Sequence, residues 1–454
     1  MIEATLPWEK LSELIALEGS QELITFIDTL SPSETARAIS RLTQEEQLRL
    51  FSLLNPGDAA DVIEYIPDAQ AAALVEDMPS AQAAAILDEL NSNHLVDVLG
   101  NLGEDSSHAI LAQMDHEDAD EARKLLSYAP DCAGGLMSSE FLAYETDDTV
   151  QDVLNDLQVN KSKYLDFHVQ YFYVVDREKK LVGVLRIHDL LFPDRGSLLT
   201  QLMIPSPLSV LDTTSLRELQ QFFEEHHLFG VPVVDGGRRL VGVVQPSAVA
   251  EAVNKRKTKT FLRLSGIIGG EEFRTMPLLS RSGRRLSWLS MNIVLNIVAA
   301  SVIALYQDTL AAAITLAVFL PMVSDMSGCS GNQAVAVSMR ELSLGLVRPR
   351  ELLWVLLKEA KVGILNGLVL GLLLGGVAYA WKGNLWLGLV VGGALAANTL
   401  VSVALGGMLP LVLRRLKLDP ALVSSPLLTT VTDMCGFFFV LSFAATIMPR
   451  LEGI

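Results

Sequence analysis

The chain has 454 residues, half of them hydrophobic, and a formal net charge of −18 at pH 7. It is too long for one hydrophobic core and too apolar to be wholly soluble. The first 150 residues hold 30 of the 53 acidic residues and 6 of the 35 basic ones, so this part carries −24 and the remainder +6. We therefore expect an acidic soluble domain at the start, which would repel nucleic acid and attract small cations.

Cysteine usage and the N-terminus bear on the cellular compartment. The three cysteines, Cys132, Cys329 and Cys435, have no paired spacing, which argues against a disulfide framework or a thiolate zinc site and favours a cytosolic soluble part. The first ten residues, MIEATLPWEK, contain neither a basic region nor a long apolar run, so we expect no signal peptide.

The segment up to about residue 128 reads as stacked short helices. Units that open with Pro, Gly, Asn or Asp and end in apolar residues at helical spacing begin at positions 56, 67, 79, 91, 103 and 115. Repeats this short cannot bury their own apolar faces, so neighbours must stack. The pattern predicts an all-α superhelical N-domain over residues 1–129. The acidic run 115–121 is either a solvated helix start, which we favour, or a site that binds divalent ions.

Residues 130–253 change to alternating strands and helices. Segments 171–191 and 231–253 each contain a β-branched run ending in Asp, a charged turn, a strand with Val-Gly-Val, and a helix. This α/β pattern resembles a tandem pair of cystathionine-β-synthase (CBS) domains, regulatory modules that pair and can bind adenine nucleotides. The resemblance implies Asp189 as a nucleotide-binding residue, whereas the second unit has Gln245-Pro246-Ser247 and no acid. The alternative for Asp189 is an ordinary helix cap.

Residues 254–286 are basic and precede the apolar part of the chain. They could lie on anionic lipid headgroups or connect two domains, and we favour a linker helix. From there to residue 454 we expect a transmembrane domain of five helices, because five apolar runs are each long enough to span a bilayer. The runs lie near residues 288–306, 309–338, 354–381, 385–413 and 421–448. Lys and Arg before the first run and after the second and fourth predict a cytoplasmic N-terminus and an outside C-terminus.

Two of these segments, 321–337 and 420–440, read as interrupted. Each starts at a proline, carries small and hydroxyl residues, and contains one aspartate, Asp325 or Asp433. A carboxylate at bilayer depth normally faces a protein interior or a water-filled path. Thr429, Thr430 and Asp433 fall on one helical stripe, which predicts the wall of a cation path. The glycines of the third and fourth runs predict close helix packing.

With these parts in order, the whole chain resembles the MgtE family of magnesium channels. The marks are 133-AGGLM-137, Pro321 followed by 331-GNQ-333, 408-MLPLVLRRLKLDPALVSSP-426, and Thr432-Asp433. The resemblance implies a homodimer in the inner membrane with a pore along its two-fold axis, and Asp433 as the main cation-selecting residue. A symmetric interface presents that carboxylate twice to a hydrated Mg²⁺ ion, which takes few direct protein ligands.

Further candidate residues accompany Asp433. We expect Asp325 to be either a second metal ligand or a structural partner of a basic side chain. The expected pore-lining residues are Gly328, Cys329, Gly331, Asn332, Gln333, Ser425, Thr429 and Thr430. Asn332 and Gln333 could equally hold helices together. Asp433 itself could instead relay protons or be a protonated packing group.

The chain departs from the family pattern in two places: the segment expected to select the ion, and the segment expected to close the pore. Ser327-Gly328-Cys329 stands where the family usually has Gly-Gly-Asn, so selectivity could differ from strict magnesium. Ser425 stands where Asn is common. The family closes when Mg²⁺ bridges acidic residues, but here Lys255, Arg256, Lys257 and Lys259 occupy the linker. We expect direct salt bridges from these cations to the acidic N-domain instead.

The function that these features predict is Mg²⁺ uptake into the cytoplasm through a gated pore. The sequence offers neither a nucleophile positioned beside a base nor a P-loop lysine, so we expect no enzyme activity. The alternatives are transport of another divalent cation, Co²⁺ or Ca²⁺, and a non-conducting membrane sensor that acts through its soluble domains.

Overall fold

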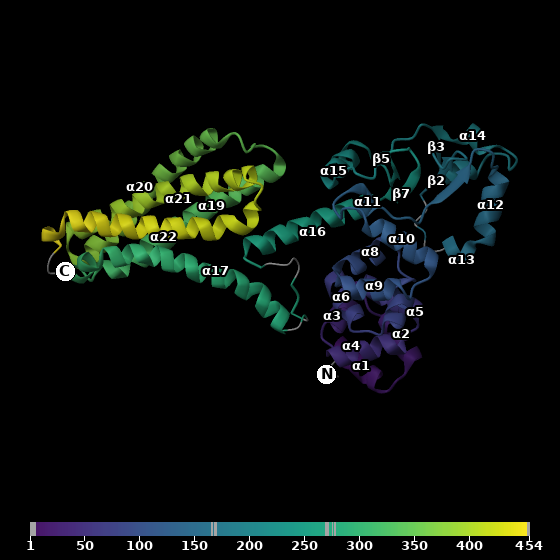
Figure 1. Ribbon diagram of the computed structural model, residues 1–454, viewed down its shortest axis with the longest axis horizontal. Coiled ribbons are helices and arrows are strands. Elements are labelled where there is room, and N and C mark those ends of the chain that lie inside the picture. The colour runs from purple at the N-terminus through teal and green to yellow at the C-terminus, as the bar shows by residue number, and fades with distance from the viewer. Residues whose placement is uncertain are drawn as a thin grey trace, which may run out of the picture. The chain divides into compact units, whose positions relative to one another are not determined.

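The computed structural model describes residues 6–164, 167, 170–267, 272–274, 276 and 278–451. It divides into two compact units, one of residues 1–257 and 273–276 and one of residues 258–272 and 277–454. Figure 1 labels many of the elements of both units.

The first unit begins with a run of short helices. They are α1 (Pro7–Ala16), α2 (Ser20–Asp28), α3 (Pro32–Ile39), α4 (Gln44–Leu53), α5 (Pro56–Glu64), α6 (Asp68–Glu76), α7 (Ser80–Leu87), α8 (Ser92–Asn101), α9 (Glu104–Leu111) and α10 (His116–Leu126). Each predicted repeat start from 56 to 115 is the first residue of a helix or its N-cap. Asn55 caps α5 because its side chain accepts a hydrogen bond from the Asp58 amide, and Pro56 fits the first helical position.

Alternate helices of this run pack together, because no single helix covers its own apolar face. α5 contacts α7, α6 contacts α8, α7 contacts α9, and α8 contacts α10. Their apolar residues form one core that includes Ile63, Leu87 and Leu99, each at most 2% exposed. The predicted superhelical N-domain is confirmed.

Two small sheets follow. The first has the order β1 (Leu142–Glu145), β2 (Tyr171–Val175), β3 (Leu181–Arg186), β4 (Ile204–Pro205), and the second β5 (Val210–Leu211), β6 (Val231–Val234), β7 (Leu240–Val244). The short helices are α11 (Ala133–Leu136), α12 (Val150–Val159), α13 (Lys161–Tyr164), η1 (Ile187–Leu190), α14 (Leu199–Leu202) and α15 (Leu216–Glu225). This is the predicted α/β pair.

The two hairpins of these sheets are built alike. Asp176 follows β2 and accepts two backbone N–H bonds of 2.9 Å, and Asp235 follows β6 and accepts two of 2.8 Å. In both turns a non-glycine residue, Lys179 or Arg238, has a positive φ. The aspartate that ends each β-branched run therefore stabilises a tight turn, which explains its recurrence in the sequence.

A single helix, α16 (Pro246–Leu264), passes through residue 253 without a break. The end of the expected CBS pair and the start of the expected linker region therefore lie in one helix, and the domain boundary at 253/254 stays a prediction. Nothing at this point interrupts the helix, because 249-VAEAVNKRKTKTFLRL-264 contains neither Gly nor Pro. Part of the predicted linker region 254–286 lies outside the described residues.

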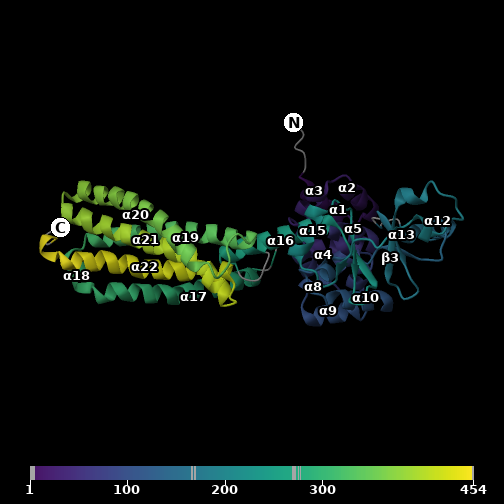
Figure 2. The same ribbon diagram turned by 90° about the horizontal axis from the view of Figure 1, so that it is seen from above.

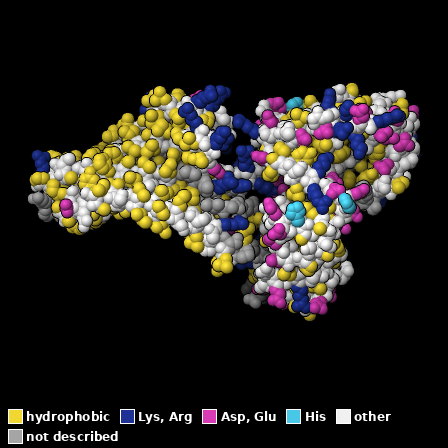
Figure 3. Space-filling view, in the orientation of Figure 1, with side chains coloured by type: hydrophobic (Ala, Val, Ile, Leu, Met, Phe, Trp, Pro, Cys, Tyr) yellow, Lys and Arg dark blue, Asp and Glu magenta, His cyan; other side chains and the backbone are white. Residues whose placement is uncertain are grey.

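The second unit holds the long helices. They are α17 (Leu278–Leu305), α18 (Gln307–Ala312), α19 (Leu316–Leu344), α20 (Leu352–Lys382), α21 (Leu385–Arg415) and α22 (Pro420–Thr446), followed by η2 (Met448–Arg450). Figures 1 and 2 together show α17, α20, α21 and α22 running side by side. Hydrophobic side chains cover most of their face in Figure 3.

Four described helices, α17, α20, α21 and α22, contain segments long and apolar enough to cross a membrane. α19 has 29 residues, but its many polar residues lower its hydropathy, and it does not belong to that set. A five-span membrane domain therefore remains a prediction. The expected run 309–338 is not one helix, because turns at 313–315 separate α18 from α19, whereas the other four runs each consist mainly of one helix.

The two segments expected to be interrupted are continuous helices. Pro321 lies inside α19 and Pro426 inside α22, and neither ends its helix. Pro321 is the sixth residue of α19 and Pro426 the seventh of α22, so each removes one intrahelical hydrogen bond. Membrane helices tolerate such a loss because neighbouring helices and Ser or Thr side chains can satisfy the freed backbone groups. The proline-led pattern marked polar membrane helices rather than breaks.

The glycine prediction is confirmed for most positions. A Cβ added at Gly371 or Gly375 on α20 would lie 2.5 Å from the Gly392 carbonyl oxygen or 2.7 Å from that of Gly388 on α21. At Gly376, in contrast, nothing lies within 4 Å. The glycines on the contact face let the two backbones approach closely.

Candidate functional site

The two membrane aspartates come from neighbouring helices. Asp433 lies in α22 and accepts a hydrogen bond from Ser324 Oγ of α19. Ser324 is buried and Asp433 half-buried, whereas the next residue, Asp325, is exposed and close enough for its charge to act on Asp433. Among the described residues no Lys, Arg or His forms an ion pair with either acid. The expected basic partner of Asp325 is thus not seen there, and two carboxylates share this part of the helix pair.

One face of α19 continues from Asp325. Cys329 and Gln333 follow at four-residue steps and are exposed in the single chain, and Asn332 is half-buried beside them. Acid, thiol and amide groups thus follow one another on a membrane helix. Such a surface is unfavourable against lipid and suits contact with water or with another protein surface.

The hydroxyl stripe of α22 is only partly accessible. Ser425 and Thr429 are half-buried, whereas Thr430 is 7% exposed. Thr429 Oγ1 donates to the Ser425 carbonyl at 3.1 Å, and Thr430 Oγ1 donates to the Pro426 carbonyl at 2.8 Å. Since the protons point into the helix, the oxygen of Thr429 remains available as an acceptor for a cation or its water.

Gly328 and Gly331 are buried inside the unit. A Cβ at Gly331 would lie 2.2 Å from Ser402 Oγ of α21, and one at Gly406 would lie 2.3 Å from the Gly331 carbonyl oxygen. In the chain, Gly331 therefore serves the close approach of α19 and α21, and a pore-lining role for it remains a prediction.

A buried polar group lies beside the aspartates and consists of Ser324, Ser327, Asn398, Ser402 and Thr432. Ser327 and Thr432 belong to motifs visible in the sequence, whereas Ser324, Asn398 and Ser402 were not predicted. Asn398, Ser402 and Thr432 are inaccessible to solvent. The signal was present, since an amide in an otherwise apolar membrane helix is unusual, but its partners come from two other helices and cannot be found by spacing within α21.

The first unit contains a lysine enclosed by acids. Lys255 of α16 has its Nζ atom 2.6 Å from Asp68 Oδ2 of α6 and 2.8 Å from Asp97 Oδ2 of α8. A third carboxylate, Glu251 one turn earlier on α16, lies at 3.0 Å. Burial acts to lower the pKa of Lys255, but the hydrogen bonds and charges of Asp68 and Asp97 outweigh it and raise the pKa above its ordinary value. The ammonium group therefore stays charged at neutral pH and ties α16 to two helices of the N-domain.

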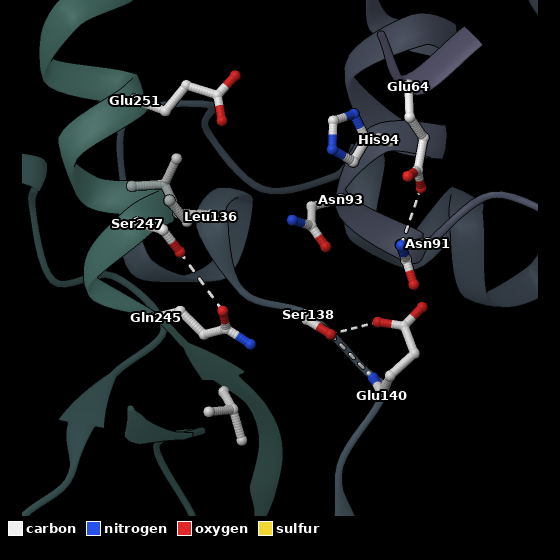
Figure 4. A pocket seen from close by; sticks show the side chains of 12 residues that line it. Glu64, Asn91, Asn93, His94, Leu136, Ser138, Glu140, Gln245, Ser247 and Glu251 are labelled. Carbon is white, nitrogen blue, oxygen red and sulfur yellow. Dashed lines mark hydrogen bonds between the residues drawn. The ribbon is translucent and has the colours of Figure 1, made fainter. Parts of the chain in front are cut away.

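A polar cavity of about 220 Å³ lies in the same unit (Figure 4). Its acids already have partners: Glu64 accepts from Asn91, Glu140 accepts from Ser92, and Glu251 pairs with Lys255. Asn93 and His94 also line it, opposite Gln245 and Ser247. Since internal donors bind its carboxylates, the cavity has no cluster of free acids for a cation.

Asp189 is engaged by its own neighbours. Its carboxylate accepts two hydrogen bonds from the Arg186 guanidinium, at 3.0 and 3.1 Å, and one from the Arg186 amide at 3.0 Å. The Arg186 hydrogen bonds, ahead of other effects, hold the pKa of Asp189 below its usual range. The cap interpretation describes this geometry, and a nucleotide-binding role of Asp189 stays a prediction.

The acidic run 115–121 forms a helix start. Asp115 caps α10 by accepting from the Glu117 amide, and Asp120 pairs with Arg123 at 2.6 Å. None of its acids belongs to a group of three or more metal-binding side chains among the residues described. The helix-start interpretation fits this geometry.

The end of α16 is bonded to the start of α22. Arg263 lies 2.5 Å from Asp419, whose side chain also caps α22 by accepting from the Ala421 amide at 3.0 Å. Arg263 thus contacts the N-cap residue of the helix that carries Asp433.

The fold and this site define a multi-pass membrane protein with a helical-repeat domain, a CBS pair and acidic residues on two packed membrane helices. Family models match three parts: a divalent cation transporter domain, MgtE, at residues 320–443, the MgtE intracellular N domain at 30–131, and CBS domains at 133–192 and 199–255. The chain belongs to the MgtE family.

Named relatives cover about three quarters of the chain. The magnesium transporter MgtE of Thermus thermophilus is 32% identical over 73% of both chains, and that of Bacillus subtilis is 27% identical over 75% of both. A crystal structure of the cytosolic domain of the Mg²⁺ channel MgtE in complex with ATP is 27% identical and covers 53% of this chain and 98% of that one, with a TM-score of 0.49.

Proposed function

We propose that this protein carries Mg²⁺ into the cytoplasm, down its electrochemical gradient, through a path at the two-fold interface of a homodimer. The names of the relatives support the ion. The observation that supports the path is the Asp433–Asp325 pair, two carboxylates at bilayer depth that no cationic side chain of the described residues neutralises. A two-fold axis beside α19 and α22 would present both acids twice.

The transported ion suits this site. Mg²⁺ keeps several of its waters and takes one or two carboxylates directly, so acids with nearby hydroxyl and amide oxygens match a partly hydrated ion. Cys329, exposed one turn after Asp325, is a soft group among hard oxygens, and it favours some passage of transition metals such as Co²⁺.

Uptake into liposomes tests the proposal. Purified protein in liposomes that enclose a Mg²⁺-sensitive dye is expected to admit Mg²⁺ under an inward gradient, and to restore growth of a magnesium-requiring bacterial strain. Parallel measurements with Co²⁺ and Ca²⁺ separate the alternative cations. Liposomes with folded protein that remain impermeable to all three ions would favour the non-conducting sensor.

For the gate, we infer that Lys255 does by itself what a bridging metal would do. Its ammonium group neutralises Asp68 and Asp97, which would otherwise repel each other, and holds α6 and α8 to α16. α16 then continues to Arg263, whose bond to Asp419 reaches α22. The state of the N-domain would therefore act on Asp433 through one helix, without a cytosolic ion.

Replacing Lys255 by glutamine is expected to loosen this contact. Amide hydrogen exchange in α6 and α8 of the full-length protein should accelerate about fivefold, equivalent to about 1 kcal/mol, since partly exposed ion pairs contribute up to about that amount. In the unmodified protein, EDTA should leave the exchange unchanged.

Lys257→Gln is the matched control, because Lys257 is exposed on the same helix and forms no ion pair with the described residues. Protection of α6 and α8 that disappears in EDTA but survives Lys255→Gln would show that a metal, not the lysine, closes the contact.

A further inference from the structure

The helix between the two acid-bearing helices contacts both of them through polar side chains. Asn398 of α21 donates one Nδ2 hydrogen bond to Ser327 Oγ of α19 and another, of 3.0 Å, to the Thr432 carbonyl of α22. Thr432 immediately precedes Asp433. One amide group thus spans from α19 to the residue before the proposed ion-binding carboxylate.

A second residue of α21 strengthens the same contact. Ser402, one turn after Asn398, donates to the Ser327 carbonyl at 2.6 Å. Ser327 is therefore bound at both its hydroxyl and its carbonyl, and it lies one turn after Ser324, which donates to Asp433. The hydrogen bonds from Asn398 and Ser402 fix the positions of Ser327 and Thr432, and these flank the Ser324–Asp433 pair on both helices.

The backbone of α22 approaches the Asn398 amide closely at a glycine. Gly436 lies one turn after Thr432, and a Cβ there would come within 2.8 Å of Asn398 Nδ2 and 3.5 Å of Ser324 Cα. A larger residue at position 436 would push α22 away from both partners. The glycine therefore lets α22 approach the amide and Ser324 together.

Stability alone does not account for the amide. Asn398 is inaccessible to solvent, and its Oδ1 atom has no hydrogen-bond partner among the described residues. An unsatisfied buried acceptor costs about 1–3 kcal/mol, so an apolar residue of similar size would fill the same space at lower cost. What the amide adds is a fixed geometry between α19 and α22.

We propose that Asn398 is a positioning residue: its two hydrogen bonds, with that of Ser402, set the distance between α19 and α22 and so orient the Asp433 carboxylate toward the ion. This inference rests on the proposed function. Loss of the two bonds would let α22 shift relative to α19 and leave the Asp433 carboxylate free to turn, which would weaken ion binding more than it slows the passage of bound ions.

The test is uptake by Asn398→Leu, which keeps the volume and removes both donors. In correctly folded protein we expect the KM for Mg²⁺ to rise at least about tenfold with a smaller change in maximal rate. The matched control is Thr399→Val. Thr399 is the next residue and is equally buried, and its hydroxyl has no partner among the described residues. The KM for Mg²⁺ of the Thr399→Val variant should therefore stay unchanged.

A spectroscopic measurement separates the inference from the transport function. The infrared carboxyl band of Asp433, identified by its loss in Asp433→Asn, should shift in Asn398→Leu and stay in Thr399→Val. The frequency of this band reports the hydrogen bonding and the surroundings of the carboxyl group, which change when the group turns, even if the protein carries no Mg²⁺. If Asn398→Leu does not fold, Ser402→Ala serves with the same criteria and a KM increase of about threefold. An unmoved band with an unchanged KM, or equal effects of the Thr399 control, would overturn the assignment.

Discussion

Asp433→Asn is expected to reduce Mg²⁺ uptake by the reconstituted protein at least about tenfold. Asparagine keeps the size of the side chain and can still accept the hydrogen bond from Ser324 Oγ, so the packing of α19 against α22 is retained. What disappears is the negative charge, twice in a symmetric dimer. Tenfold corresponds to about 1.4 kcal/mol, a modest share of the attraction between a divalent ion and two carboxylates at low dielectric.

The comparison for this variant is Asp308→Asn. Asp308 lies in the short helix α18, which contacts α22, but its side chain is exposed and forms no ion pair or hydrogen bond with the described residues, so its replacement should leave uptake unchanged. Uptake that falls equally in both variants would indicate a general effect of acidic charge. Unchanged uptake by Asp433→Asn would place the ion path elsewhere.

Gly375→Ala is expected to destabilise the membrane unit by several kcal/mol. The added Cβ would lie 2.7 Å from the Gly388 carbonyl oxygen and 3.3 Å from Gly392 Cα, and both are backbone atoms that can move only if α20 and α21 separate. Overpacking of this kind typically costs about 1–3 kcal/mol, and the loss of further contacts along two 31-residue helices adds to it. The measurement is the midpoint of thermal unfolding in detergent.

Gly376→Ala, at the neighbouring position, is the matched control, because nothing lies within 4 Å of a Cβ at that position. This change should be neutral or raise the free energy of unfolding by up to about 1 kcal/mol, since Ala has a higher helix propensity than Gly. If both variants unfold at the same temperature, the close approach of α20 and α21 does not limit stability.

The site was foreseen in part. A carboxylate in an apolar run is visible at once in a sequence, because few residues are as unfavourable in lipid, so Asp325 and Asp433 could be named without coordinates. Ser324 could not, because its importance comes from a hydrogen bond to a residue 109 positions away. The expected breaks at Pro321 and Pro426 were wrong, since an interior proline removes a single intrahelical hydrogen bond and a packed membrane helix can continue through it.

The contact between the N-domain and α16 was also predicted only in part from the sequence. The basic residues from Lys255 to Lys259 predicted salt bridges to the acidic N-domain, and Lys255 makes them. Neither Asp68 nor Asp97 could be chosen in advance from the 30 acids of the first 150 residues. Which acids meet the lysine depends on how α6 and α8 stack in the superhelix.

The sequence alone determined the order of the domains, the short helical repeats, the two β-hairpin units, and the presence of acids in the membrane helices. These features are local: periodicity, turn residues and charge act over a few positions along the chain. Only the tertiary structure decided which glycines face a neighbouring backbone, which carboxylates enclose Lys255, and that Asn398 links α19 to α22. Those contacts join residues far apart in sequence, and their geometry is set by the packing of whole helices.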